Sequence, residues 1–186
     1  MLLNHLMTLQ PSAILQVTLS SAVKSTLLRV LSGIYKADKG EAIIDGINVY
    51  ENTYMKNKLV FVADELFFLA GANMKSMAKF YSSIYDNFDM DIFTELTKTF
   101  GLDPSKSISN FSKGMKRQAA IILALSTRAK YMFFDETFDG LDPVMRNSNA
   151  LKLTLIKIIQ TCALISLDRS MQRKQSLLQF IIITNV

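Results

Sequence analysis

Apolar positions near the start of the chain form first a continuous run and then a helical pattern. The run over residues 13–17 predicts a short buried strand, and the small residues 18–23 after it are expected to form a loop. Leu27, Leu28, Val30 and Leu31 then follow Lys24-Ser25-Thr26 at helical spacing, and Gly33 is a typical helix stop. This segment therefore predicts a strand, a loop and a helix.

The next segment has the pattern of a hairpin followed by a buried strand. Residues 41–44 and 47–50 flank Asp45-Gly46, a dipeptide that favours a two-residue hairpin turn. The apolar run 59–62 predicts a further strand. Residues 74–85 and 90–100 then have helical periodicity and indicate a helical insert, which we place at about residues 70–127.

The second half of the insert and the rest of the chain alternate between helix and strand. Ser112 is a favourable N-cap for a helix over residues 113–127, and residues 131–134 predict a buried strand. Pro143 is expected to open another helix toward residue 160, and residues 163–166 predict a last strand. The order predicts one α/β domain over residues 1–186, with a mainly parallel sheet, flanking helices, an antiparallel hairpin and a helical subdomain.

Composition agrees with a folded domain and narrows its setting. Among 186 residues 49% are hydrophobic and 20% charged, which excludes wholesale disorder. The net charge of +5 suits a nucleotide, a nucleic acid or an anionic membrane face without deciding between them. Cys162 is the single cysteine, so no internal disulfide can form and a reducing cytosol is expected. No apolar run is long enough to span a bilayer, so a membrane link is expected through a partner.

The first candidate site is the polar segment that opens the first helix. Strand, tight loop, Lys-Ser/Thr and helix form the layout of a P-loop, in which Ser21 and Ala22 would offer loop amides to phosphate. Lys24 would reach the outer phosphates, Ser25 would take Mg²⁺, and Thr26 would continue the helix start. The alternative is an ordinary helix start.

The glycines of that motif are missing from this chain. Thr18 and Val23 stand at the glycine positions, and Ser21 stands at a middle position that glycine often fills. Val23 is β-branched, and forcing it into a conformation that glycine permits costs about 1–3 kcal/mol.

The second candidate site is Asp135-Glu136, directly after the strand over residues 131–134. Open α/β sheets bind ligands at the carboxyl ends of their strands. One carboxylate can hold Mg²⁺ through water, while its neighbour orients or deprotonates the attacking water. The alternative is a strand end followed by a polar turn.

Longer strings around these residues resemble ABC transporter ATPases. Residues 133–143, Phe-Phe-Asp-Glu-Thr-Phe-Asp-Gly-Leu-Asp-Pro, are similar to the Walker B and D-loop block of that family. Residues 111–118, Phe-Ser-Lys-Gly-Met-Lys-Arg-Gln, resemble its signature motif in the variant of bacterial exporter-type subunits. Residues 25–33 and 40–46 also match, and the resemblance covers roughly residues 13–166.

The resemblance implies a P-loop NTPase-like fold and a role for each matching residue. Asp135 would be the Mg²⁺-associated aspartate and Glu136 the catalytic glutamate. Ser112 and Gly114 would contact the γ-phosphate of a nucleotide bound to the opposite subunit, and Asp142 would lie in the D-loop at the dimer interface.

The resemblance also implies an ATP-binding subunit with ATP and Mg²⁺ as cofactors. Its partners would be a transmembrane transporter subunit, which the helical insert would face, and a second ABC subunit in a homo- or heterodimer. It would lie on the cytoplasmic face of the cell membrane, and no nucleic-acid partner is expected. The alternatives are a hydrolysis-deficient regulatory or structural subunit and an interaction domain that binds no nucleotide.

Several positions depart from the family pattern. Asp64 stands where the Q-loop glutamine is expected; it can still ligate a metal, although an exposed loop carboxylate is more often only solvated. The switch histidine expected near residues 167–168 is missing, since His5 is the only histidine. Residues 169–186 form an atypical tail. A truncated or altered gene would explain these departures together, and resequencing that finds an intact frame without neighbouring homologous fragments would contradict it.

Overall fold

The fold was derived from a computed structural model, which describes residues 7–9, 21–135 and 163–167. The strand predicted at residues 13–17 and the helix predicted after Pro143 lie outside these described residues, as do Glu136, Asp142 and the tail.

The central sheet is parallel and has the strand order β4-β5-β6. Its strands are β4 (Leu59–Val62), β5 (Tyr131–Asp135) and β6 (Ala163–Leu167). All three were predicted to within one residue. Phe133 is in register with Phe61 on one side and with Ile165 on the other, so β5 is the middle strand of the three. Its five residues are all buried, as expected for a strand covered on both faces.

A second sheet contains the predicted hairpin. Strand β2 (Ala42–Ile44) pairs antiparallel with β3 (Ile47–Asn48), and β1 (Met7–Leu9) pairs parallel with β2. The turn residues Asp45 and Gly46 have φ of 52° and 74°, which confirms the two-residue turn with positive φ at both positions. Strand β1 was not predicted.

The helices are α1 (Ser21–Leu31), α2 (Thr53–Asn57), α3 (Met74–Ser82), α4 (Met90–Thr99) and α5 (Lys113–Ser126), with a 3₁₀ turn η1 (Ile108–Asn110). The predicted helices at residues 74–85, 90–100 and 113–127 are confirmed with slightly earlier ends. Side-chain caps explain their starts, because Asn73, Asp89 and Ser112 each accept hydrogen bonds from amides of the first turn. The short α2 and η1 were not predicted.

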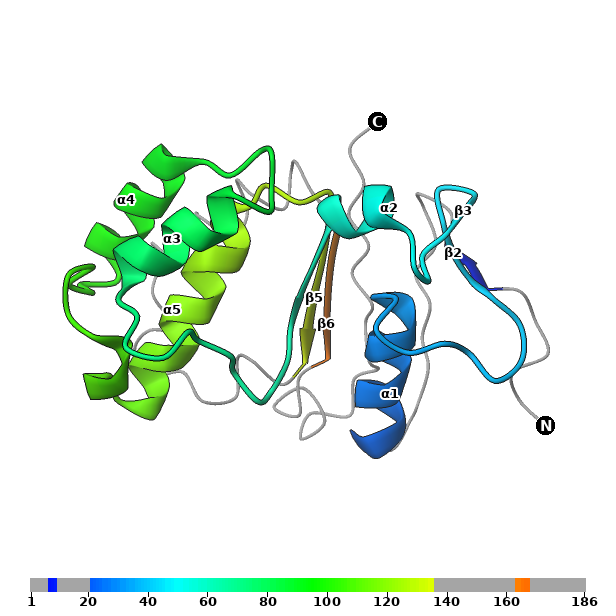
Figure 1. Ribbon diagram of the computed structural model, residues 1–186. Coiled ribbons are helices and arrows are strands. Elements are labelled where there is room, and N and C mark those ends of the chain that lie inside the picture. The colour runs from blue at the N-terminus through cyan, green and yellow to red at the C-terminus, as the bar shows by residue number, and fades with distance from the viewer. Residues whose placement is uncertain (1–6, 10–20, 136–162, 168–186) are drawn as a thin grey trace.

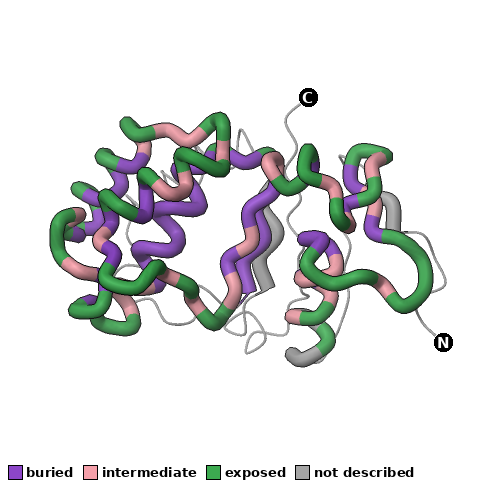
Figure 2. The backbone as a smooth tube through the Cα atoms, viewed as in Figure 1, coloured by how far each residue is buried: buried purple, intermediate pink, exposed green. Residues whose placement is uncertain are grey.

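The central sheet separates two packed layers. Figure 1 shows helices α3, α4 and α5 on one side of β4, β5 and β6, with α1 and the hairpin sheet on the other. Alternate residues of β5 contribute to the two layers, since Met132 and Phe134 belong to the helical core cluster while Tyr131 and Phe133 pack with α1 and the hairpin. Figure 2 shows the buried positions of α5 and the sheet inside an exposed outer layer.

Helix α1 begins earlier than predicted. Residues 18–23 were expected to form a loop before the helix, whereas Ser21, Ala22 and Val23 form the first turn of α1. Glycine at these positions would have more freedom to adopt the open loop, because it has no Cβ.

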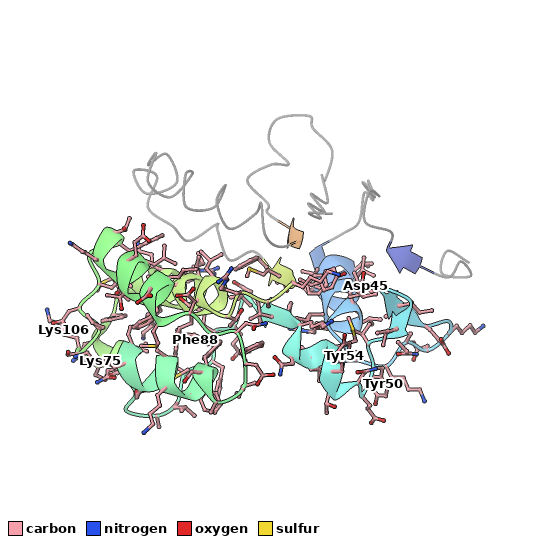
Figure 3. The ribbon with its side chains drawn as sticks, turned by 90° about the horizontal axis from the view of Figure 1, so that it is seen from above. Asp45, Tyr50, Tyr54, Lys75, Phe88 and Lys106 are labelled. Carbon is pink, nitrogen blue, oxygen red and sulfur yellow. The ribbon has the colours of Figure 1, made fainter. Side chains whose placement is uncertain are left out.

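One ion pair joins the hairpin to the central sheet. The Nζ atom of Lys130 lies 2.7 Å from Oδ2 of Asp45, and Lys130 directly precedes β5. Burial alone would raise the pKa of Asp45, but hydrogen bonding with Lys130 and Tyr131 and the charges of Lys130 and Lys58 lower it below its ordinary value. Figure 3 shows Asp45 with Tyr50 and Tyr54 on the same half of the molecule, and Lys75 and Lys106 at the far end of the helical layer.

Candidate functional site

Several element ends face the same side of the molecule. The carboxyl ends of the parallel strands β4 and β5 point in one direction, and Figure 1 shows the N-termini of α1 and α5 on that same side. Helix N-termini offer free backbone amides and the positive end of the helix dipole. Helix α1 packs against β5, so its N-terminus faces the side on which the strands end and on which α/β folds bind ligands. The N-terminus of α5 lies away from α1, at the outer end of the helical layer.

Asp135 lies at this edge as the last residue of β5. It is 1% exposed, and it is in register with Leu167, the last residue of β6. A buried carboxylate at a strand end is a suitable oxygen ligand for a hard cation such as Mg²⁺. Glu136 follows directly in the sequence and lies outside the described residues.

The predicted phosphate-binding residues all fall in α1. Ser21 and Ala22 are its first two residues, and Lys24, Ser25 and Thr26 follow within its first two turns. Ser25 is half-buried and Thr26 is exposed. The start of α1 can present its amides to phosphate, but from a helical turn rather than from the open loop that was predicted.

Ser112 and Gly114 lie at the start of α5. The Ser112 hydroxyl accepts a hydrogen bond from the Met115 amide at 3.2 Å, so Ser112 is the N-cap that the sequence predicts. Ser112 is exposed and Gly114 half-buried, which leaves the turn accessible at the surface. The capping role and a phosphate-contacting role are compatible, because one capping bond satisfies only one of the amides at a helix N-terminus.

Asp64 lies two residues beyond β4 and is engaged by a residue that sequence reasoning missed. Its Oδ1 atom lies 2.6 Å from Nη2 of Arg117, in the second turn of α5. Its role as a metal ligand remains a prediction. The signal in the sequence was limited to the opposite charges of Asp64 and Arg117. The two residues are too far apart in the chain for the sequence alone to indicate that they pair.

In the described part of the chain, no group of three or more His, Cys, Asp or Glu residues could hold a metal ion. Among the same residues, no helix has the length and apolar character needed to cross a membrane.

The chain matches one protein family over most of its length. The family described as "ABC transporter" matches residues 7–139. The chain is 27% identical over 124 residues to the ABC transporter ATP-binding protein YtrB of Bacillus subtilis, which covers 67% of this chain and 42% of YtrB. It is 29% identical over 157 residues to the energy-coupling factor transporter ATP-binding protein EcfA1 of Oenococcus oeni, covering 80% of this chain and 56% of EcfA1. The chain thus spans about half the length of these curated relatives.

Solved structures agree on the fold. An ATP-binding subunit of an ABC transporter superposes with a TM-score of 0.70 at 20% identity, covering 86% of this chain and 69% of that structure. A putative ABC transporter ATP-binding protein from Pyrococcus furiosus gives a TM-score of 0.65 at 21% identity, covering 78% and 72%. These likenesses confirm the predicted P-loop NTPase-like α/β fold. Together with the family match over residues 7–139, they lead to one conclusion: the chain belongs to the ABC transporter family.

Proposed function

We propose that this chain is the ATP-binding subunit of an ABC transporter and couples the binding and hydrolysis of Mg-ATP to a membrane partner. The observation that carries the proposal is that Asp135, at the carboxyl end of β5, and the N-terminus of α1, a helix that packs against β5, face the same side of the sheet. Triphosphate needs cationic and amide donors, and its metal needs carboxylate oxygen. This edge offers both kinds of group.

The start of α1 is the proposed phosphate site. Amides of Ser21 and Ala22 would donate to phosphate oxygens, and Lys24 would supply a positive charge. Relatives that are named as ATP-binding proteins, including YtrB and EcfA1, support this assignment.

Magnesium would be held at the same edge by Asp135 and Ser25, with Asp64 as a further candidate ligand. The oxygen donors of these residues suit Mg²⁺, whose charge would neutralise phosphate oxygens during phosphoryl transfer. Glu136, which follows Asp135, would orient the attacking water and accept its proton. Burial of Asp135 keeps its carboxylate out of bulk water. Electrostatic interactions are stronger in the protein interior than in water, because the interior has a lower dielectric constant.

A second ABC subunit would complete the site. The exposed Ser112 and the accessible turn that contains Gly114 would contact the nucleotide held by that subunit, and Asp142 would lie at the interface between the two. Whether the partner is a second copy or a different ABC subunit, the pairing brings α5 of one subunit to the phosphate site of the other.

The helical layer is the proposed contact with a transmembrane subunit. Phe67, in the segment between β4 and α3, is 71% exposed, and Ile84, just after α3, and Met90, the first residue of α4, are also exposed. Large apolar side chains at a surface mark sites of protein association when they lie together. The chain would accordingly lie at the cytoplasmic face of the membrane and be held there by its partner.

One observation favours a second candidate, a subunit that binds nucleotide without hydrolysing it. Val23 lies in the first turn of α1, where a glycine-containing loop would wrap the phosphates more closely. A looser phosphate site would still permit binding and dimerisation while positioning the γ-phosphate poorly for attack.

The two candidates are separated by a thermal-shift measurement with Mg-ATP followed by steady-state phosphate release. We expect Mg-ATP to raise the melting temperature, by an amount that grows with ligand excess over Kd. Phosphate release that Glu136→Gln abolishes, without loss of the thermal shift, would support the hydrolysing subunit. A shift without turnover would support the second candidate. No shift at millimolar ATP would contradict both and leave an interaction domain that retains the fold.

A further inference from the structure

Among the residues that the structure describes, one ion pair connects the segment that follows β4 to the helix that carries Ser112 and Gly114. Nη2 of Arg117 lies 2.6 Å from Oδ1 of Asp64, a distance typical of a strong charge-assisted hydrogen bond. The two residues are 53 positions apart in the sequence. Asp64 comes from the segment that leaves β4, and Arg117 comes from the second turn of α5.

The burial of the two partners is unequal. The Arg117 side chain is 7% exposed, whereas the Asp64 side chain is 56% exposed. A buried guanidinium must be satisfied by acceptors, and leaving it without one is costly, so Arg117 is held in place by its surroundings. Asp64 is the member of the pair that can be altered without opening the core.

We infer that the Asp64–Arg117 ion pair positions the first turn of α5, including Ser112 and Gly114, relative to the carboxyl ends of the sheet strands. For its functional consequence this inference rests on the proposed function, because the contact of Ser112 and Gly114 with nucleotide is part of that proposal. Its structural content, a fixed first turn of α5, stands independently of nucleotide.

The geometry explains how an ion pair can act at a distance along the helix. Arg117 follows Ser112 by five residues, which corresponds to about 7 Å along a helix axis. The intervening turn is hydrogen-bonded from its start, since the Lys116 amide donates to the Ser112 carbonyl at 2.9 Å. Fixing the Arg117 guanidinium against Asp64 therefore fixes the turn that precedes it. Arg117 and Asp64 are positioning residues in this scheme.

Amide hydrogen exchange of the full chain without nucleotide, in metal-chelating buffer, tests the structural content. We expect Asp64→Asn to increase exchange of the peptide covering residues 111–117 by about threefold or more, with little change in residues 93–100 of the same layer. The matched control is Glu65→Gln, which removes the neighbouring exposed carboxylate and should leave both peptides unchanged.

A double-mutant cycle separates the pair from general destabilisation. Arg117→Met removes the charge while keeping a long apolar stem, and Arg117→Lys keeps the charge but loses the planar fork. If the pair carries the effect, Asp64→Asn should add nothing to Arg117→Met. Unchanged exchange in Asp64→Asn would overturn the inference, and so would an equal increase in residues 93–100 and 111–117.

Turnover provides the functional arm. If the wild-type chain hydrolyses ATP, Arg117→Met should lower kcat by about tenfold while the Kd for Mg-ATP from thermal shifts stays unchanged, because positioning acts on the reacting complex. A parallel weakening of Kd would contradict a positioning role. If the wild-type chain neither binds nor hydrolyses ATP, the proposed function fails, while the exchange experiment still decides whether the ion pair fixes the turn.

Discussion

Gly33 lies so close to Val49 that a side chain cannot be added without displacing backbone. A Cβ built on Gly33 would come within 2.6 Å of the Val49 carbonyl oxygen, and Gly33 has a φ of +70°. We expect Gly33→Ala to lower the free energy of unfolding by about 2–4 kcal/mol, since it combines backbone strain with a clash. Urea denaturation followed by circular dichroism would measure this.

Gly71 provides the matched control for that substitution. It also has a φ of +70°, but a Cβ there meets nothing within 4 Å. Gly71→Ala should therefore report the cost of positive φ alone, about 1 kcal/mol. Equal costs at both glycines would show that the close approach of Gly33 to Val49 contributes nothing.

Restoring a glycine in the first turn of α1 should change nucleotide affinity and stability in opposite directions. Val23 is helical and 48% exposed. Val23→Gly should destabilise the nucleotide-free chain by about 0.5–1 kcal/mol. It should also tighten Mg-ATP binding by about fivefold to tenfold, because the turn no longer resists the conformation that wraps phosphate. Isothermal titration calorimetry measures the affinity.

Val23→Ala is the control for this pair of effects. It removes the β-branch but keeps a Cβ, so it should leave affinity near the wild-type value and slightly favour the helix. If both variants bind Mg-ATP as the wild type does, the phosphate site does not depend on the backbone at residue 23.

Alkaline pH should destabilise the protein through its partly buried tyrosines. Burial raises the pKa of Tyr85 to about 12, and the neighbouring Tyr81 adds to the shift. The unfolded state loses its phenolic proton near pH 10, so this part of the stability is present below pH 10 and is lost as pH rises toward 12. Tyr85→Phe should make the free energy of unfolding fall less steeply in that interval.

Tyr85→Phe should also lower the free energy of unfolding slightly at neutral pH. The Tyr85 hydroxyl donates to the Leu59 carbonyl oxygen at 3.3 Å, and its loss should cost about 1 kcal/mol. Tyr35→Phe, which alters an exposed tyrosine, is the control variant for both measurements. If the free energy of unfolding of Tyr85→Phe falls with pH as steeply as that of the wild type, Tyr85 is not the source of the alkaline destabilisation.

Acid pH should weaken the contact between the hairpin and the central sheet. The pKa of Asp45 is lowered in the folded state, so its contribution to stability is present above the unfolded value near 3.9 and is lost as pH falls through the folded value. Because Lys130 is 49% exposed, the contribution at pH 7 should be below about 1 kcal/mol and should shrink further with salt.

Asp45→Asn isolates this effect without disturbing the turn. Asparagine tolerates the positive φ of residue 45, so the hairpin should persist while the acid-dependent loss of stability becomes smaller. Thermal melts from pH 2 to pH 7 on the variant and on Asp38→Asn, which alters an exposed carboxylate, provide the comparison. An unchanged acid profile in Asp45→Asn would contradict the assignment.

Local patterns predicted most of the described fold. The Asp45-Gly46 turn, the apolar strand β4 and the capped helix that follows Ser112 each depend on residues within a few positions of one another. Asp135 and Ser112 were predicted for the same reason, since a strand end and a helix cap are local features.

The missed features depend on distant or weak signals. Strand β1 is only three residues long and pairs in parallel with β2, more than thirty positions later, so no alternation within it could indicate the pairing. The early start of α1 was missed because the P-loop layout favoured a loop over residues 18–23. Arg117 was missed because its partner Asp64 is 53 residues away.

Helix α5 is enclosed along most of its length, and this restricts how its first turn can move. Ten consecutive residues, from Arg117 to Ser126, are buried. This part of the helix is therefore packed on all sides, which restricts its rotation about its own axis. Close-packed interiors transmit displacement rather than absorb it. A displacement of α3 or α4 should therefore move α5 as a rigid body. The first turn of α5, at Ser112 and Gly114, would move with it.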